Sequence, residues 1–528
     1  MRRIVTTAVV VALWGGAALS APAVAADHTR PAGRPGAPSV PTPAEALELT
    51  PERALPTLED EATPGEALAT ARRVLGGDAL PRDPSPTIAL RDLWMKKDRL
   101  SGQQRRVAES ILARPTDGAA DNQGFGYTVP EAAPLCNARL CVHYVPTGTD
   151  APPSVDWVAQ NLAVMDSVWT QEVDQLGYRA PLADGARGGS PLFDVYLKDL
   201  GGDIYGFCAG ESKVKRRTAS GYCVLDNDFA ASQFPNGTPT DNLTVTAAHE
   251  FFHAVQYAYD YAEDPWMMES TATWMEERIA TAVDDNRQYL PWSQIYAPYL
   301  PLDLFSRNEG YQYGNWVFWE YLSTLYGNDI VHKAWSQAGS LKSDGGKNSI
   351  AALQKVLRKK GGLTKVYARF AAGNLTPAAT YPEGAAYPTP KVRGGKALSK
   401  KKRTKRFSTR INHLASASYV YAPGKGLGAK KWRLQVAVNG PVKATSPAAV
   451  VVVHRTNGKR QVKIVKLNRA GDGRMKVKFG GKQVAAVSVT LVNASTRYRC
   501  GRNTVLACKG LPLDDKARFT VTGRVVKR

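Results

Sequence analysis

The sequence lacks any long apolar run after its first 25 residues. A transmembrane helix needs about 20 consecutive apolar residues, and no later segment supplies them. The one apolar stretch, Ile4 to Ser20, follows two arginines and precedes Ala23-Val24-Ala25, a pattern typical of a cleaved secretory signal. We therefore predict a signal peptide over 1–25, no transmembrane segment after its removal, and a secreted, extracellular or cell-surface protein. An uncleaved membrane anchor is the alternative.

Cysteine is scarce, and the Cys-x-x-Cys spacing that many zinc sites use is absent. The six cysteines fall into three local pairs: Cys136 with Cys141, Cys208 with Cys223, and Cys500 with Cys508. Nearest-neighbour pairing would close three short loops, although sequence alone does not fix the connectivity. Because disulfides persist in oxidising compartments, this cysteine usage agrees with export. A second metal site is the alternative.

Acidic residues are almost absent from the C-terminal part of the chain. Residues 391–528 contain 34 Lys and Arg but only 3 Asp and Glu, a formal charge of +31, whereas 1–390 carry −9. A field of one sign attracts polyanions. We expect this region to fold alone and to bind an anionic cell-wall polymer, acidic lipid, polysaccharide or nucleic acid. Charge that only keeps the region soluble is the alternative.

Changes in composition divide the rest of the chain. Residues 26–120 read as an N-terminal helical extension or propeptide without a catalytic constellation. The segment 121–385 mixes strand and helix patterns, 386–409 is a Pro/Gly-rich and then basic linker, and 410–528 carries short alternating runs. The sequence therefore predicts an α+β domain followed by an all-β sandwich-like C-terminal domain.

Local patterns place the elements of these two domains. Helices are expected at 154–176, 243–260 with Asp241 as N-cap, 265–280 opened by Asp264 and Pro265, 311–326, 329–338, 348–360 and 363–373. Strands are expected at 193–197, 222–225, 432–438, 449–453, 461–465 and 484–492.

The segment His249-Glu250-Phe251-Phe252-His253 lies in the predicted helix 243–260. Two histidines four residues apart lie on one helix face, one turn apart, so both imidazoles can reach one metal ion. Glu250 follows the first histidine and lies near that ion without binding it, which suits a general base that deprotonates water at the metal. The alternative is a surface helix with two histidines and no metal.

Catalytic zinc usually takes three protein ligands and leaves a fourth position for water. The extension His-x-x-Gly-x-x-His is absent, because Gln256 and Tyr259 occupy those places, and this excludes the metzincin arrangement. Glu269, in a largely apolar setting where a lone carboxylate is costly, is the best third ligand. Glu276 and Glu277 are rivals, and a carboxylate that only caps the helix is the alternative.

These residues together resemble the gluzincin metallopeptidases. The shared pattern is HExxH at His249–His253, followed by Trp-x-x-Glu-x-x-Ala at Trp266, Glu269 and Ala272. The segment is most similar to the hyicolysin type and related secreted bacterial metalloproteases, over about 220–330. The resemblance implies a zincin-like metallopeptidase fold for the α+β domain, a Zn²⁺ cofactor, and a protein or peptide substrate.

The resemblance also assigns roles. His249, His253 and Glu269 would bind zinc, and Glu250 would be the base. Tyr311, in a segment similar to the Tyr-x-x-Gly of the aminopeptidase type, would steady the oxyanion, with Tyr313 as second choice and core packing as the alternative.

Two departures from the family pattern matter. The Gly-x-Met-Glu-Asn segment that holds a free amine is absent, which favours an endopeptidase. Thr273 stands where thermolysin-like enzymes have an aspartate that orients a ligand histidine, so the outer residues of the site must differ.

Other polar residues give weaker signals. His143, His332, His413 and His454 lack partners at ligand spacing and are expected to be structural or surface histidines. Asp226-Asn227-Asp228 is expected to be a turn rather than a calcium loop. A non-catalytic surface or polyanion-binding protein with a degenerate protease domain is the alternative function.

Overall fold

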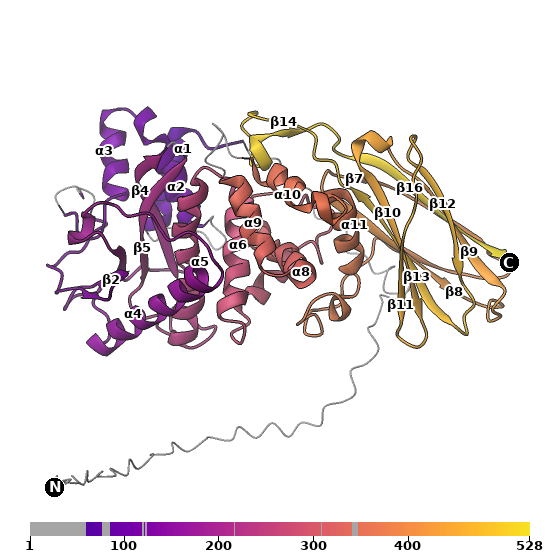
Figure 1. Ribbon diagram of the computed structural model, residues 1–528, viewed down its shortest axis with the longest axis horizontal. Coiled ribbons are helices and arrows are strands. Elements are labelled where there is room, and N and C mark those ends of the chain that lie inside the picture. Colours follow the sequence, from indigo (N-terminus) through magenta and orange to yellow (C-terminus); the bar gives the residue numbers. More distant parts are fainter. Residues whose placement is uncertain are drawn as a thin grey trace, which may run out of the picture. The chain divides into compact units, whose positions relative to one another are not determined.

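The computed structural model describes residues 60–76, 85–118, 121, 124–215, 217–307, 309–339 and 347–528 (Figure 1). All of them belong to one compact unit, Pro38–Arg528. The predicted signal peptide, 1–25, lies outside the described residues. Within the described ranges, no helix combines the length and the apolar character that crossing a bilayer requires.

Three short helices open the described chain: α1 Pro64–Leu75, α2 Pro86–Lys96 and α3 Gly102–Ile111. Thr63 and Ser85 cap the first two, because each hydroxyl accepts a hydrogen bond from the backbone N–H three residues on. Leu93 of α2 shares a core with Tyr196 of the central sheet. The helices predicted within 26–120 thus cover one face of that sheet.

The central sheet is mixed. Its strands are β1 Leu135–Cys136, β2 Leu140–His143, β3 Phe193–Lys198, β4 Gly206–Lys215 and β5 Thr218–Asp226, in the order β1-β2-β3-β5-β4. Strands β2, β3 and β5 are parallel, whereas β1 and β4 are antiparallel edge strands. Val224 packs towards α1–α3 and Leu225 into the opposite core, so β5 is buried on both faces.

The other face is covered by α4, Val155–Trp169, which continues as a π turn, Thr170–Gln175, and by α5, Pro239–Asp260. The helix predicted from Ser154 is confirmed. The predicted N-cap of the motif helix is wrong: α5 begins earlier, with Thr238 as N-cap, and Asp241 is the third residue of a capping box with it.

Helices dominate the chain after α5, as predicted. They are α6 Pro265–Ile279, a 3₁₀ helix Asp285–Trp292, α7 Tyr311–Gly314, α8 Trp316–Tyr326, α9 Asp329–Ala338, α10 Ser349–Leu357 and α11 Leu363–Gly373. Asn315 breaks the predicted helix 311–326 into α7 and α8.

The C-terminal region is an all-β sandwich (Figure 1). One sheet has the order β11-β10-β13-β8-β6 and the other β12-β9-β16-β7. The bounds are β6 Gly394–Leu398, β7 Thr404–Ile411, β8 Ala415–Pro423, β9 Trp432–Asn439, β10 Pro447–Arg455, β11 Arg460–Ile464, β12 Asp472–Lys478, β13 Val484–Asn493 and β16 Ala517–Lys527, with a small pair β14 Tyr498–Arg499 and β15 Leu511–Pro512. Alternate residues such as Leu434 and Val451 fill the space between the sheets.

The linker predicted over 386–409 is wrong in its second half. Strands β6 and β7 lie there, paired with β8 and β16. The basic residues Lys400–Arg403 form the connection between them. Both strands are edge strands, and charged side chains are common on such strands. The basic residues therefore made this segment resemble a linker in sequence.

The sandwich shares a core with the helical part. Leu414, Val450, Val452 and Val492 belong to the same buried cluster as the central helices, and α11 packs on β10 and β13. This arrangement does not match the prediction that 391–528 fold alone, since a separated sandwich would expose this apolar face.

A buried polar network reinforces the junction. His413 lies 3.0 Å from Asp303 and 3.3 Å from Asp515 through its two ring nitrogens. Asp264, the residue before α6, accepts a 2.8 Å hydrogen bond from the backbone N–H of Cys508. The two histidine contacts explain why His413 is a structural histidine, as predicted.

Candidate metal centre

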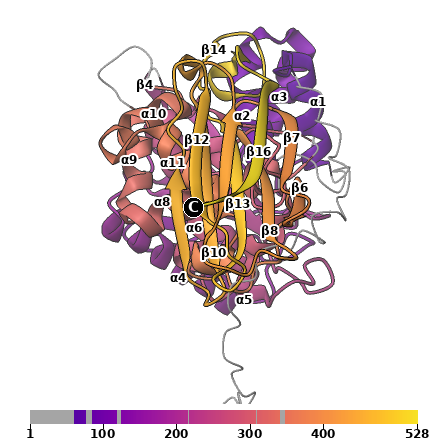
Figure 2. The same ribbon diagram turned by 90° about the vertical axis from the view of Figure 1, so that its right-hand side faces the viewer.

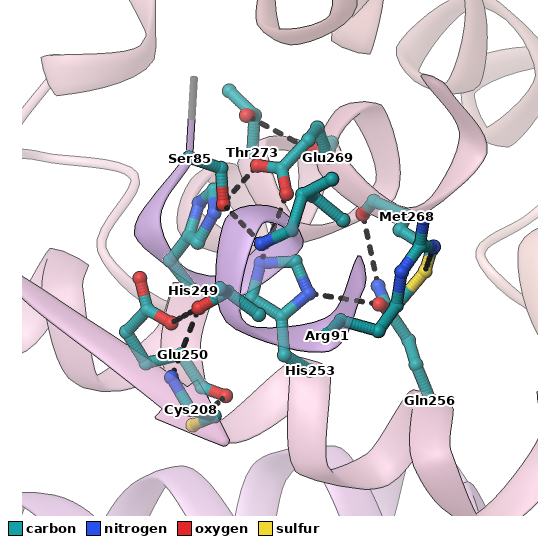
Figure 3. A network of polar contacts seen from close by, with 12 residues as sticks. Ser85, Arg91, Cys208, His249, Glu250, His253, Gln256, Met268, Glu269 and Thr273 are labelled. Carbon is teal, nitrogen blue, oxygen red and sulfur yellow. Dashed lines mark hydrogen bonds and ion pairs between the residues drawn. The ribbon is translucent and has the colours of Figure 1, made fainter. Parts of the chain in front are cut away.

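Helices α5 and α6 bring the predicted ligands together (Figure 3). His249 and His253 lie one turn apart on α5, with ring centroids separated by 4.9 Å. Glu269, near the start of α6, faces both: its carboxylate oxygens lie 3.3 Å from His249 Nε2 and 3.5 Å from His253 Nε2. The short turn between α5 and α6 thus lets the three ligands predicted from the sequence face one another.

Burial tests whether these residues fit a metal ion. His253 and Glu269 are both 0% exposed, and among the described atoms His253 Nε2 and Glu269 Oε1 have no hydrogen-bond partner. Unsatisfied buried polar atoms are costly. The ligand atoms of His249, Glu250 and His253 also lie within 4.8 Å of one another. A cation between the nitrogens and the carboxylate would satisfy both orphaned atoms, and a two-His, one-carboxylate set suits catalytic zinc.

Two residues outside this trio orient the imidazoles. His249 Nδ1 donates to Glu276 Oε1 over 2.6 Å, and His253 Nδ1 donates to Gln256 Oε1 over 2.9 Å. Gln256 in turn donates to the backbone oxygen of Met268 over 2.9 Å. With both Nδ1 atoms engaged, each Nε2 faces the carboxylate of Glu269, and a metal ion could lie between them.

The rivals for the third ligand fall into other roles. Glu276 contacts the outer nitrogen of His249 rather than the inner one. Glu277 points away and accepts from Asn286 over 2.7 Å. The role of Gln256 could not be predicted from sequence, where this residue is notable only because it replaces the glycine of the metzincin extension after His253.

The surroundings of Glu269 and Glu276 shift the pKa values of the two carboxylates in opposite directions. Burial acts to raise the pKa of Glu269, but the neighbouring histidines outweigh it and hold the pKa below the ordinary value. Burial raises the pKa of Glu276 to about 7, despite its contact with His249. Burial also lowers the pKa of His253. Glu269 is therefore held as an anion, and burial favours the neutral imidazole of His253, which is the form a metal requires. Burial also acts to lower the pKa of His249, but Glu269 and Glu276 outweigh it and raise that pKa well above its ordinary value, so a metal ion would have to displace a proton from His249.

Glu250 lines a cavity of about 480 Å³ together with His249. Its carboxylate is not isolated, because Thr87 Oγ1 on α2 donates to it over 2.8 Å. The same hydroxyl accepts a 2.9 Å hydrogen bond from the backbone N–H of Cys208 on the edge strand β4. Ser85, the N-cap of α2, contacts Glu269. The start of α2 therefore lies directly against the centre.

The structure corrects the position of the aromatic hydroxyl. Tyr311 is buried in the core and does not line the cavity. Tyr313 lines the cavity, its ring centroid 6.0 Å from that of His249, and it stacks on Tyr289. Two residues along a helix point about 200° apart, so only one of these tyrosines can face the site.

A second polar cluster has a structural explanation. Cys141, His143 and Asp194 come close enough for a metal, but Cys141 is bonded to Cys136. His143 instead lies 3.0 Å from Asp194, which also pairs with the buried Arg114. The predicted structural role of His143 is consistent with these contacts.

The structure also shows the disulfide pairing and the conformation of the Asp226 segment. The disulfides are Cys136–Cys141, Cys208–Cys223 and Cys500–Cys508, the nearest-neighbour pairing. The Asp226 carboxylate accepts from the backbone N–H groups of Asp228 and Phe229, which makes this segment a turn.

Comparison with known proteins adds little. No protein-family model matches the chain, and no curated protein does. Among solved structures, it is similar to a family GH115 4-O-methyl-alpha-glucuronidase with specificity for decorated arabinogalactans. That similarity has 8% sequence identity and a TM-score of 0.13, and covers 67% of this chain and 54% of the other, so this chain spans about half of that protein's length. A TM-score this low carries no argument about fold or function.

Proposed function

We propose that this protein is a secreted zinc metallopeptidase whose α+β domain is zincin-like. The observation that carries the proposal is the buried convergence of His249, His253 and Glu269, with two unsatisfied polar atoms facing each other across the gap. Burying two unsatisfied polar atoms costs stability, and a metal ion bound between them would remove that cost. A non-catalytic binding protein would have no reason to keep such an arrangement. The three disulfides support an extracytoplasmic location.

In this proposal His249, His253 and Glu269 hold Zn²⁺. A bound zinc ion would supply an activated water and polarise the scissile carbonyl. Glu276 and Gln256 hold the two imidazoles with their Nε2 atoms inward. Glu250 lies at the cavity wall, where its carboxylate can accept a proton and pass it to the leaving amine.

Tyr313 is the hydroxyl that can donate to the oxyanion. It lines the same cavity as Glu250 and lies beside His249, whereas Tyr311 does not line it. Burial raises the pKa of Tyr313 well above its ordinary value, so the phenol keeps its proton as a donor. This assignment replaces the role first given to Tyr311.

The substrate is a protein or peptide, cleaved internally. The cavity of about 480 Å³ accepts a few residues of a chain. The sequence lacks the family segment that captures a free amine. The absence of this segment favours an endopeptidase, whereas the cavity volume is compatible with a peptide substrate.

Metal analysis combined with cleavage of casein tests the proposal. We expect about one zinc ion per chain and proteolysis that a chelator stops and added zinc restores. The alternative, a surface-binding protein with a degenerate protease domain, predicts neither zinc nor cleavage. A metal-free, inactive preparation that takes up no zinc on addition would reject the proposal.

A further inference from the structure

A groove in the sandwich gathers positive charge. Its volume is about 400 Å³, and seven of its nine lining side chains are basic. They come from five strands or their ends: Arg433 of β9, Arg455 of β10, Lys463 of β11, Lys476 and Lys478 of β12, and Lys527 of β16, followed by Arg528. Figure 2 shows this side of the sandwich, with the C-terminal end of the chain in front.

Strand register explains why these side chains converge. Lys478 is the cross-strand partner of Arg433 in the β12–β9 pair, and Lys476 lies two residues away on the same face. Lys463 belongs to β11, the edge strand of the other sheet. The groove therefore lies where the edge strands β11 and β12 of the two sheets meet.

No acidic side chain in the described part of the chain offsets the positive charge of the groove. No carboxylate side chain lines it, and among the described residues none of the seven forms an ion pair with Asp or Glu. Like charges held together in this way repel one another and lower the stability of the fold. Arg433 is also fixed, because its guanidinium donates to the backbone oxygens of Lys430 and Trp432 over 2.6 and 2.9 Å.

We propose that this groove is a binding site for a linear polyanion without aromatic bases, recognised through its closely spaced phosphate or carboxylate groups. Guanidinium groups match both anions with paired hydrogen bonds, and lysines add point charges. The remaining lining residues are Gln461 and Val477, so no ring is present on which a nucleic-acid base could stack. The site is independent of the proposed peptidase function, since it shares no residue with the metal centre.

Binding of inorganic polyphosphate and of polyglutamate to the full-length protein tests this site, and the two probes separate phosphate from carboxylate. In K463Q/K476Q/K478Q we expect the affinity for the preferred probe to fall at least about tenfold at about 0.05 M salt. The slope of log affinity against log salt should become shallower by about 3.

The matched control removes the same charge elsewhere in the sandwich. Lys396, Lys401 and Lys443 are exposed and do not line the groove. We expect K396Q/K401Q/K443Q to change the affinity less than about twofold. Equal losses in both variants would overturn the proposal, because net charge rather than the groove would then bind. So would no binding by the unaltered protein, or an oligonucleotide of equal charge that binds about tenfold tighter than either probe.

Discussion

Glu250 is the residue on which the proposed chemistry depends most directly. Its amide analogue, Glu250→Gln, keeps the shape of the side chain and the contact with Thr87 but cannot accept a proton. We expect zinc content to be unchanged and casein cleavage to fall by several powers of ten, within the range of catalytic variants. A zinc-loaded Glu250→Gln protein with full activity would show that another group is the base.

Three acidic residues on α6 allow a graded test of metal binding. Glu269→Ala removes the proposed third ligand and should abolish tight zinc binding. Glu276→Gln loses only the charge behind His249 and should weaken zinc binding by about 10- to 100-fold. Glu277→Gln, whose partner is Asn286, is the control and should bind zinc normally. Zinc titration of the three variants gives this order, and tight binding by Glu269→Ala would contradict the ligand assignment.

The two tyrosines of α7 can be separated in the same way. Tyr313→Phe removes the hydroxyl at the cavity and should lower kcat by about 10²- to 10³-fold, as loss of an oxyanion donor does. Tyr311→Phe alters a core position and should change kcat little. Steady-state kinetics on one peptide decide between them, and the reverse result would restore Tyr311.

Single residues also show how far the sequence predicts this site. The two histidines and the base follow from spacing along one helix, and Glu269 follows from family resemblance and its apolar setting. Glu276 and Gln256 could not be given their roles, because each depends on which ring nitrogen it meets in space. Tyr313 could not be separated from Tyr311, because the direction of a one-turn helix is set by its neighbours.

At the level of elements, α2 is an unexpected part of the centre. Thr87 bridges the proposed base, Glu250, and the backbone of β4, although it lies 163 residues from Glu250 in sequence. Thr87→Val keeps the shape but leaves the buried N–H of Cys208 without a partner, so we expect a loss of about 1–3 kcal/mol in stability. Thr87→Ser, which keeps the hydroxyl, should lose much less. Chemical denaturation of both variants measures the difference.

Long helices with regular apolar spacing could be predicted from the sequence. Strands whose apolar alternation is interrupted by charged residues or glycine could not. The helices α4, α6 and α9 follow from caps and apolar spacing. Strand β7 resembles a linker in sequence because Lys405, Arg406 and Arg410 occupy exposed positions, and β6 does so because it begins with two glycines. The start of α5 was placed late because Asp241 is as good a cap as Thr238 in sequence, and only the capping box shows which residue begins the helix.

At the scale of the whole molecule, we expect the stability of the junction between the helical part and the sandwich to depend on pH. Burial opposes charging of His413, but Asp303 and Asp515 outweigh it and raise its pKa to about 9. The ordinary value is about 6.5, so this contribution to stability is fully present below about pH 6.5 and is lost as the pH rises through about 9. The shift corresponds to about 3 kcal/mol.

His413→Asn should therefore destabilise the full-length protein strongly at about pH 6 and much less at about pH 10. Thermal unfolding of the variant and the unaltered protein across this range gives the comparison. A difference in unfolding temperature that does not change with pH would show that His413 is neutral in the fold.

The hydrogen bond from Cys508 to Asp264 has a consequence for biosynthesis. Asp264 begins the helix that carries Glu269, and its partner lies 244 residues later, in a loop closed by Cys500–Cys508. The ribosome delivers that loop long after α5 and α6. A chain that stops before Cys508 lacks this hydrogen bond and keeps the contacts of the Asp264 carboxylate with Ser349. If Glu269 binds zinc as proposed, a chain truncated before Cys508 should bind zinc more weakly than the full-length protein.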